Sequence, residues 1–248
     1  NVASDTWYAT LVSVPNAPDV TVAVTEADDG SFLVSLDDRA LSSPAKRPLR
    51  LPTCGVAEAI AAEWDAQGEK VDPSSMAMMS FAATVTDRVT PQRDHVVGEI
   101  AGFGGSDLLC FLADGPDELV ARQVSQWTPW RERAEKRLAL RLAVTSGVMP
   151  VRQSEESLAA FRAAVDAVDD WHLAPLHTAT SITGSLILAL AFLDGELGAR
   201  EAFDLSQIDE AFQVEKWGQD REAEQRRRNL LAEMTAAERF KGLLRTVN

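Results

Sequence analysis

The chain has 248 residues, of which 46% are hydrophobic and 25% are charged, and its formal net charge is −14. This composition is typical of a folded globular protein and argues against disorder over most of the length. The negative charge excludes nucleic acid and anionic membranes as expected partners, because their phosphate groups repel an acidic surface. The charge favours a basic surface of another protein as the partner.

The first fifty residues have the alternation of short strands. The pattern is partial over residues 8–14, clearer over 20–24, and resumes over 32–36 after a turn at 28–30. Turn residues between alternating segments are typical of hairpins. Residues 49–51 add a short extended piece. This order predicts a small antiparallel meander.

From Thr53 onward the pattern changes to helices. Thr53 suits the N-cap of a helix that runs to about Gln67 and ends at Gly68. Pro73 suits the start of a second helix, which Pro91 ends. The helices expected are 53–67, 74–88, 92–102, 118–142, 154–169, 175–193, 206–233 and 236–244, with a short strand at 107–113.

The change of pattern predicts a domain boundary near residue 92. Residues 1–92 carry 6 basic and 13 acidic residues, and residues 93–248 carry 18 and 25, so each part has a net charge of −7. The acidity is therefore not confined to a tail. The predicted fold is α+β, with a small N-terminal antiparallel β-rich domain, 1–92, followed by a mainly α-helical C-terminal domain, 93–248.

Two cysteines and one apolar run bear on the compartment. Cys54 and Cys110 are far apart in sequence, and free cysteines are usually buried, so two buried thiols in a reducing compartment are expected rather than a disulfide. The longest strongly apolar stretch, 185–193, is about half the length that spans a bilayer. No signal-peptide pattern follows Asn1. We expect a protein that neither spans nor binds a membrane.

No motif indicates a cofactor or a catalytic centre. Residues 102–105 lack the glycine register of a dinucleotide fingerprint and the lysine of a phosphate loop. His172 and His177 lie on different faces of a helix and, with His95, do not form a converging zinc set. Ser185 lacks the second glycine of a nucleophile elbow. We expect no cofactor and no metal, and a pair of carboxylates distant in the chain is the catalytic alternative that stays open.

The most informative segment is residues 206–228. Ser206 and Asp209 resemble a capping box at the start of a helix. The opposite side of that helix is expected to face the core through Ile208, Phe212 and two later apolar residues, Ala223 and Leu230. At helical spacing, one narrow arc carries three carboxylates, an amide and an aromatic ring: Glu210, Gln213, Trp217, Asp220 and Glu224.

Trp217 therefore lies on the polar side of the expected helix. A tryptophan there is either covered by a neighbouring helix or available to a partner, and both interpretations stand at this point. Tryptophan is a common anchor of interfaces, and carboxylates around it would meet arginine or lysine side chains of a partner. Gly218 costs about 1 kcal/mol relative to alanine inside a helix, which suggests a kink or a close backbone approach beside the indole.

Five stretches carry motifs in order along nearly the whole chain. They are Leu-Asp to Pro at 36–44, Leu-Pro-Thr to Glu-Trp-Asp-Ala-Gln at 51–67, Asp-Leu-Leu-Cys-Phe at 107–111, Gly-Ser-Leu-Ile-Leu-Ala-Leu at 184–190, and a signature at 205–227 that includes Asp-Glu, Phe-Gln, Glu215, Trp-Gly and Asp220. Together they resemble one known family, the assembly chaperones of the ATP synthase α subunit. The departures from the family pattern are Asp38 and Ser43 in place of glycine and threonine, no Met-Pro pair within 76–79, and no basic residue before Trp7.

The resemblance implies a two-domain protein, β-rich and then helical, without catalysis. It also implies a protein partner, the unassembled α subunit of ATP synthase, whose subunit interface is shielded until the hexamer forms. The arc and the family signature together give the expected partner-binding residues: Glu210, Gln213, Glu215, Trp217, Asp220 and Glu224.

The expected compartment is the bacterial cytoplasm, or the mitochondrial matrix for a trimmed eukaryotic form, and the expected state is a monomer. Two alternatives come from other classes of protein. A small acid/base hydrolase or isomerase would have a deep cleft with two converging acids of raised pKa. A structural subunit would be recovered in stoichiometric amounts with mature ATP synthase.

Overall fold

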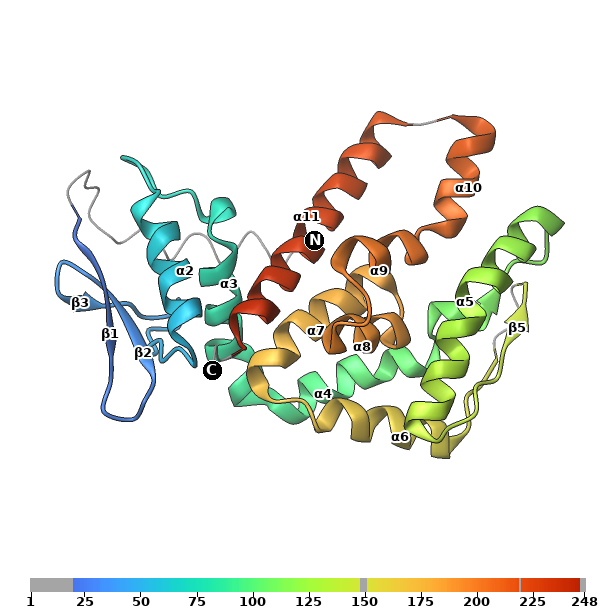
Figure 1. Cartoon of the computed structure of the whole chain (residues 1–248), viewed down its shortest axis with the longest axis horizontal. Helices are drawn as coiled ribbons and strands as arrows, with labels where there is room; N and C mark the ends of the chain where they lie inside the picture. The colour runs from blue at the N-terminus through green and yellow to red at the C-terminus, as the bar shows by residue number, and fades with distance from the viewer. Residues whose placement is uncertain (1–19, 148–150, 219, 246–248) are drawn as a thin grey trace. The chain divides into compact units, whose positions relative to one another are not determined.

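The computed structural model describes residues 20–147, 151–218 and 220–245. It divides into two compact units, formed by the described parts of Asn1–Arg93 with Arg239–Asn248 and of Asp94–Glu238. The mainly helical structure with a small sheet near the N-terminus confirms the predicted α+β class (Figure 1). The division into two domains, 1–92 and 93–248, stays a prediction. The strand expected at 8–14 lies outside the described residues.

The sheet of the first unit is the predicted antiparallel meander. Its strands are β1 (Val22–Glu26), β2 (Phe32–Leu36) and β3 (Arg39–Ala40), in that order. β2 forms as predicted, whereas β1 begins two residues later than the alternation indicated. Val24 pairs with Val34, which is buried, so the register turns the valines inward.

The turn between β2 and β3 is built by two aspartates. Asp37 and Asp38 have φ values of 47° and 64°, a left-handed conformation that aspartate tolerates better than most residues. The Asp37 carboxylate accepts a hydrogen bond from the Thr21 N–H at 3.0 Å, which ties the turn to the start of the meander.

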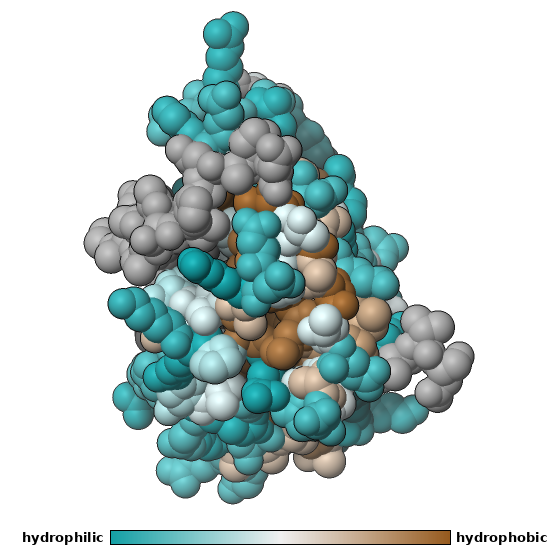
Figure 2. Space-filling view, turned by 90° about the vertical axis from the view of Figure 1, so that its left-hand side faces the viewer, coloured by the Kyte–Doolittle hydropathy of each residue, from teal (hydrophilic) through white to brown (hydrophobic). Residues whose placement is uncertain are grey.

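Figure 2 shows the side on which the sheet lies, with hydrophobic residues in the middle and hydrophilic residues around them.

The first helix of this unit, α2 (Cys54–Asp65), begins where predicted. The Thr53 hydroxyl accepts a hydrogen bond from the Val56 N–H at 3.2 Å, which confirms the N-cap. The helix ends two residues before Gln67, whose side-chain amide instead donates to the Glu63 carbonyl. Trp64 lies on the buried side of α2 and is 7% exposed, so it belongs to the core.

The second expected helix is wrong in both its start and its end. Pro73–Ser75 form a 3-10 turn, and α3 (Ala77–Thr84) follows. The chain then continues through one wider helical turn, Val85–Val89, and a 3-10 turn, Thr90–Gln92, into α4 (Arg93–Gly102). Pro91 does not end the helix, because it stands in a first turn, where a missing N–H leaves no bond unmade.

A buried carboxylate sets the start of α3. Glu63 of α2 accepts hydrogen bonds from the backbone N–H groups of Met78 at 2.7 Å and Met79 at 2.9 Å. These donors have no partner within their own helix, so a side chain from α2 satisfies them. Burial raises the pKa of Glu63, although the two hydrogen bonds act in the opposite direction.

The second unit is built from helices with a two-stranded parallel ladder, β4 (Phe111–Leu112) and β5 (Thr145–Ser146). The strand expected at 107–113 forms only at 111–112, because Asp107 caps a 3-10 turn at Leu108–Cys110. The helices after α4 are α5 (Asp117–Leu138), α6 (Glu155–Asp166), α7 (Asp170–Thr183), α8 (Leu186–Asp194), α9 (Ala199–Ser206), α10 (Ile208–Trp217) and α11 (Arg221–Leu243).

The helix expected at 175–193 is in fact two helices. α7 starts five residues before Pro175, because the Asp169 carboxylate caps it by accepting from the Trp171 and His172 N–H groups. Gly184, with φ +65°, ends α7, and the Ser185 hydroxyl caps α8. The opposite error occurs near the C-terminus, where the separate helix expected at 236–244 is the end of α11.

Asp107 is a buried carboxylate of the second unit. Its carboxylate is fully buried and accepts from the Ser185 hydroxyl at 2.8 Å and from the N–H groups of Leu109 at 3.1 Å and Ile187 at 3.0 Å. It therefore joins the 3-10 turn to the N-terminus of α8. Burial raises the pKa of Asp107 to about 6, against hydrogen bonds that lower it.

The two cysteines have different surroundings. Cys110 is buried, as predicted, and burial raises the pKa of its thiol to about 12. The prediction for Cys54 is wrong, because this residue is exposed. It is the first residue of α2 and lies off the stripe that Val56 and Ile60 bury. Both thiols are free.

Candidate protein-binding surface

The segment expected to be one helix from 206 to 233 is divided in two places. Ser206 is the last residue of α9, and its hydroxyl donates to the Phe203 carbonyl at 2.7 Å instead of capping α10, so the predicted capping box is wrong. The second division is at Gly218, where φ is +87° and the chain leaves the helix. No atom lies within 4 Å of the position that a Cβ would occupy there, so the glycine serves a kink and not a close approach.

These divisions split the expected arc between two helices. Glu210, Gln213 and Trp217 lie on α10, whereas Asp220 precedes α11 and Glu224 lies in its first turn. The Asp220 carboxylate faces the N–H groups of the first turn of α11 at 3.4 Å, and Glu224 pairs with Arg228 at 3.9 Å. Both acids therefore have local partners beyond the kink, and the arc is not continuous.

α10 packs against α5 through one apolar centre and a surrounding set of polar contacts. Ile208 and Phe212 are buried at 4% and 2% exposure. The Arg122 guanidinium and the Lys216 ammonium lie over the Phe212 ring, at 5.5 and 5.1 Å from its centre. The Trp127 N–H of α5 donates to the Leu205 carbonyl at 2.8 Å, just before α10 begins. This side of α10 is therefore occupied.

The charged residues of this contact form the α5–α10 clamp, which we define as Arg122 and Glu118 of α5 with Glu215 and Lys216 of α10. Arg122 donates to both carboxylate oxygens of Glu215, at 2.7 and 2.9 Å, and Lys216 pairs with Glu118 at 2.8 Å. Arg122 lowers the pKa of Glu215. Gln123 adds a hydrogen bond to Asp209. Glu215 is thus turned toward α5, away from the surface where we expected it to bind a partner.

The opposite side of α10 is only partly exposed, since Gln213 and Trp217 are exposed and Glu210 and Val214 are half-buried. At 100° per residue, Glu210, Gln213, Val214 and Trp217 lie away from Phe212, and we call these four residues the outer face of α10. Trp217 is 78% exposed, more than any other large hydrophobic residue that the structure describes. The indole is therefore not part of the core. Val214 was not among the predicted binding residues. Its spacing, three residues before Trp217 and four after Glu210, is the signal that places it on the same face.

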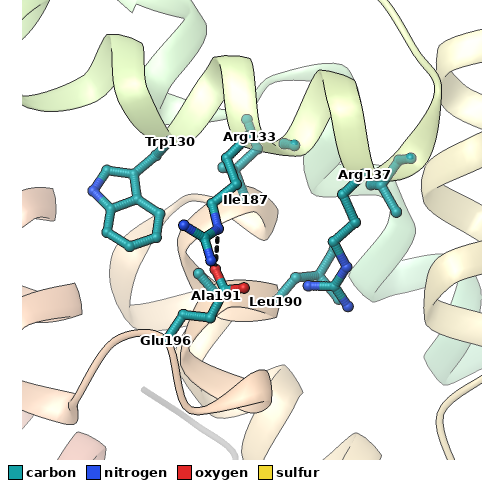
Figure 3. Close-up of a pocket in the computed structure, with 9 residues that line it drawn as sticks. Trp130, Arg133, Arg137, Ile187, Leu190, Ala191 and Glu196 are labelled. Atoms are coloured by element: carbon teal, nitrogen blue, oxygen red, sulfur yellow. Dashed lines mark ion pairs between the residues drawn. The ribbon is translucent and has the colours of Figure 1, made fainter.

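A groove between α5 and α8 is the other candidate site (Figure 3). It is shallow and has an apolar floor that includes Leu190 and Ala191. Trp130 and Arg133 extend from α5 at its rim, where Arg133 pairs with Glu196. The charged residues that line the groove are Arg133, Arg137 and Glu196. Glu196 is paired with Arg133, so these side chains do not form an acid–base couple for catalysis.

The acids with raised pKa values lie outside this groove. Glu63 and Asp107 are engaged by backbone N–H groups, and burial raises the pKa of Glu233 on α11. The converging pair of acids that a hydrolase or isomerase would need is therefore not found in the described residues. Within those residues no group of three or more possible ligands could hold a metal ion. None of the helices described is long and apolar enough to cross a membrane.

Comparison with known proteins gives a consistent result. The family described as "ATP12 chaperone protein" matches residues 18–135. The crystal structure of Atp12 from Paracoccus denitrificans is 42% identical, covers 91% of this chain and 96% of its own, and superposes with a TM-score of 0.87. Atu1473 from Agrobacterium tumefaciens, described as a candidate chaperone, is 40% identical over 90% of this chain and 84% of its own, with a TM-score of 0.85. The mitochondrial protein atp12 of Schizosaccharomyces pombe is 23% identical over 206 residues, which are 78% of this chain and 71% of that protein.

Proposed function

This chain belongs to the ATP12 chaperone family, and from that premise we propose that it binds the unassembled α subunit of ATP synthase and shields its subunit interface until the catalytic hexamer forms. The family and its relatives are chaperones and not enzymes, which agrees with the lack of a catalytic pair among the described residues. The client, the compartment and the binding residues are part of the proposal.

The observation that carries the proposal is the exposed indole of Trp217 on the outer face of α10. A large apolar ring in water is unfavourable, and its burial against a partner contributes more binding free energy than most residues do. Glu210 lies two helical turns before Trp217 on the same side and adds a half-buried negative charge to that face. The fitting surface on the client is an apolar pocket with an arginine or lysine at its edge.

The physics of an unassembled ring subunit supports this role. Such a subunit exposes a large apolar interface, which leads to aggregation until its neighbours arrive. A chaperone has to cover that interface and then leave it. One aromatic anchor with an acid on the same face suits reversible binding, because charges at the rim of an interface affect encounter and partner choice more than they affect affinity. We further propose that the chain acts as a monomer. It would share a compartment with its client, either the bacterial cytoplasm or the mitochondrial matrix.

The proposal is tested by co-expression of the α subunit with this chain, followed by size-exclusion chromatography and cross-linking. Wild type is expected to keep the α subunit soluble and to co-elute with it. Trp217→Ala and Glu210→Lys are each expected to weaken binding by about tenfold or more. The first variant removes the aromatic anchor, and the second reverses the negative charge at position 210.

The matched control is Glu132→Lys, which makes the same charge change on an exposed position of α5. It is expected to bind as wild type does. If Trp217→Ala and Glu210→Lys fold normally and protect the α subunit as well as the control, the outer face of α10 is not the binding surface. Recovery of the chain in stoichiometric amounts with mature ATP synthase would contradict a chaperone that leaves its client.

A further inference from the structure

We propose that Arg122 of α5 is a positioning residue, which holds the last turn of α10 so that Trp217 faces the client. This inference rests on the proposed function, because it concerns how the binding residue is presented. It assigns a role to a residue that lies outside the binding surface itself.

The first argument is the shortness of α10 and the place of its apolar contacts. A helix of ten residues is marginal in water, so its direction depends on packing. Its buried residues, Ile208 and Phe212, both lie in its first half. Trp217 comes five residues after Phe212, and the next residue, Gly218, has open space where a side chain would begin. The turn that carries the indole thus has no fully buried apolar residue, since Val214 within it is half-buried, and it gains no packing at the glycine that follows.

The second argument is that the α5–α10 clamp acts on this turn. Glu215 and Lys216 immediately precede Trp217, and each is paired with α5, at 2.7 Å to Arg122 and 2.8 Å to Glu118. The two pairs have opposite polarity, so a shift of the turn that moves Glu215 toward Glu118, or Lys216 toward Arg122, brings like charges together. They therefore fix the rotation of α10 about its axis, and with it the direction of Trp217.

The third argument separates the clamp from an ordinary surface ion pair. Arg200 and Asp204 on α9 pair within one helix, and their side chains are 70% and 47% exposed. Such pairs contribute little, because water competes for both charges. The Arg122 side chain is only 27% exposed, donates two hydrogen bonds across 93 residues of sequence, and stacks over the buried Phe212 ring. A planar, two-pronged guanidinium fixes orientation as well as charge.

The experiment combines one reversal, one exchange and one control in the full-length chain: Arg122→Glu, the double variant Arg122→Glu with Glu215→Arg, and Arg200→Glu. Two quantities are measured for each. One is the hydrogen exchange rate of the backbone amides from Val214 to Trp217. The other is the affinity for purified ATP synthase α subunit. Melting temperatures show that each variant is folded.

Arg122→Glu is expected to speed exchange in the last turn of α10 and to weaken α-subunit binding by about tenfold, because two carboxylates then face each other. The exchanged pair is expected to restore both quantities to within about threefold of wild type, as charge-swapped partners regain their coupling. Arg200→Glu is expected to change neither. A loss of binding that the exchanged pair does not restore overturns the positioning role, since Arg122 would then contact the client directly. Unchanged exchange in Arg122→Glu also overturns it.

The experiment separates failure of the positioning role from failure of the proposed function. If Trp217→Ala binds the α subunit as wild type does, the binding surface is wrong whatever the clamp does. If Trp217→Ala loses binding while Arg122→Glu loosens α10 and binds normally, the binding surface stands and the positioning role fails.

Discussion

The helices α8 and α10 are similar in length, lie in the same unit, and are held in place by opposite means. Every residue of α8 from Leu186 to Phe192 is buried, and α8 packs against α5, α7 and α9. α10 buries only Ile208 and Phe212 and packs mainly against α5. A helix that is apolar all round is fixed by burial, whereas one with a single apolar contact keeps a side free for another molecule.

The two helices also use their carboxylates differently. Asp107 is fully buried beside the start of α8 and accepts hydrogen bonds from the Ser185 hydroxyl and from the N–H groups of Ile187 and Leu109. Glu215 on α10 is 52% exposed and pairs with Arg122 across a solvated contact. Loss of Asp107 leaves buried N–H groups unpaired, whereas loss of Glu215 leaves a partner that water can reach. This difference predicts where substitution affects folding and where it affects binding.

The largest effect is expected for Asp107→Ala. Removal of the carboxylate leaves the N–H groups of Leu109 and Ile187 buried without their acceptor, although it also removes a desolvated charge. The expected net loss is about 3 kcal/mol of unfolding free energy, measured by urea denaturation. The matched control is Asp94→Ala, an aspartate that is 93% exposed and pairs with Arg162. Equal stability of the two variants would mean that Asp107 does not hold α8.

A smaller effect is expected from pH. The pKa of Asp107 is raised from 3.8 to about 6, so the folded state keeps this proton at pH values where an unfolded chain has lost it. The stability that the proton contributes is complete below about pH 4 and is lost as pH rises through about 6. Lowering the pH from 7 to 5 is therefore expected to add about 1 kcal/mol of unfolding free energy relative to Asp107→Asn.

That comparison is made by urea denaturation of wild type and Asp107→Asn at both pH values. Both chains share all other titrating groups, so their difference isolates Asp107. A difference that stays constant, or that moves against wild type as the pH falls, contradicts the raised pKa.

Local sequence signals predicted the parts of the fold that local physics controls. β2, the Thr53 cap and the buried side of α2 follow from alternation, a hydroxyl before an apolar stripe, and helical spacing. The start of α7 had a signal that the expectation overlooked, because Asp169 is a better N-cap than Pro175 is a first residue. Helix positions were therefore predicted better than helix ends.

The residues of the proposed binding surface were predictable only as neighbours on one helix face. The spacing of Glu210, Gln213 and Trp217 is a property of one helix, and these residues do share a face. The orientation of Glu215 depends on Arg122, which is 93 residues away in the sequence. Nothing near Glu215 indicates that partner, and the kink at Gly218 broke the arc before Asp220 and Glu224. Contacts between distant segments are what the sequence pattern does not contain.

The smallest effect is expected for the stability of Trp217→Ala, and it sharpens the contrast between the helices. An indole that is 78% exposed makes few contacts to lose, so the unfolding free energy is expected to stay within about 0.5 kcal/mol of wild type. Trp127→Ala is the matched control, since that ring is fully buried and its N–H donates to Leu205, and it is expected to cost about 3 kcal/mol or more. A loss above about 1 kcal/mol for Trp217→Ala in urea denaturation would place the indole in the packing of α10, because only a contact within the chain can stabilise the free protein.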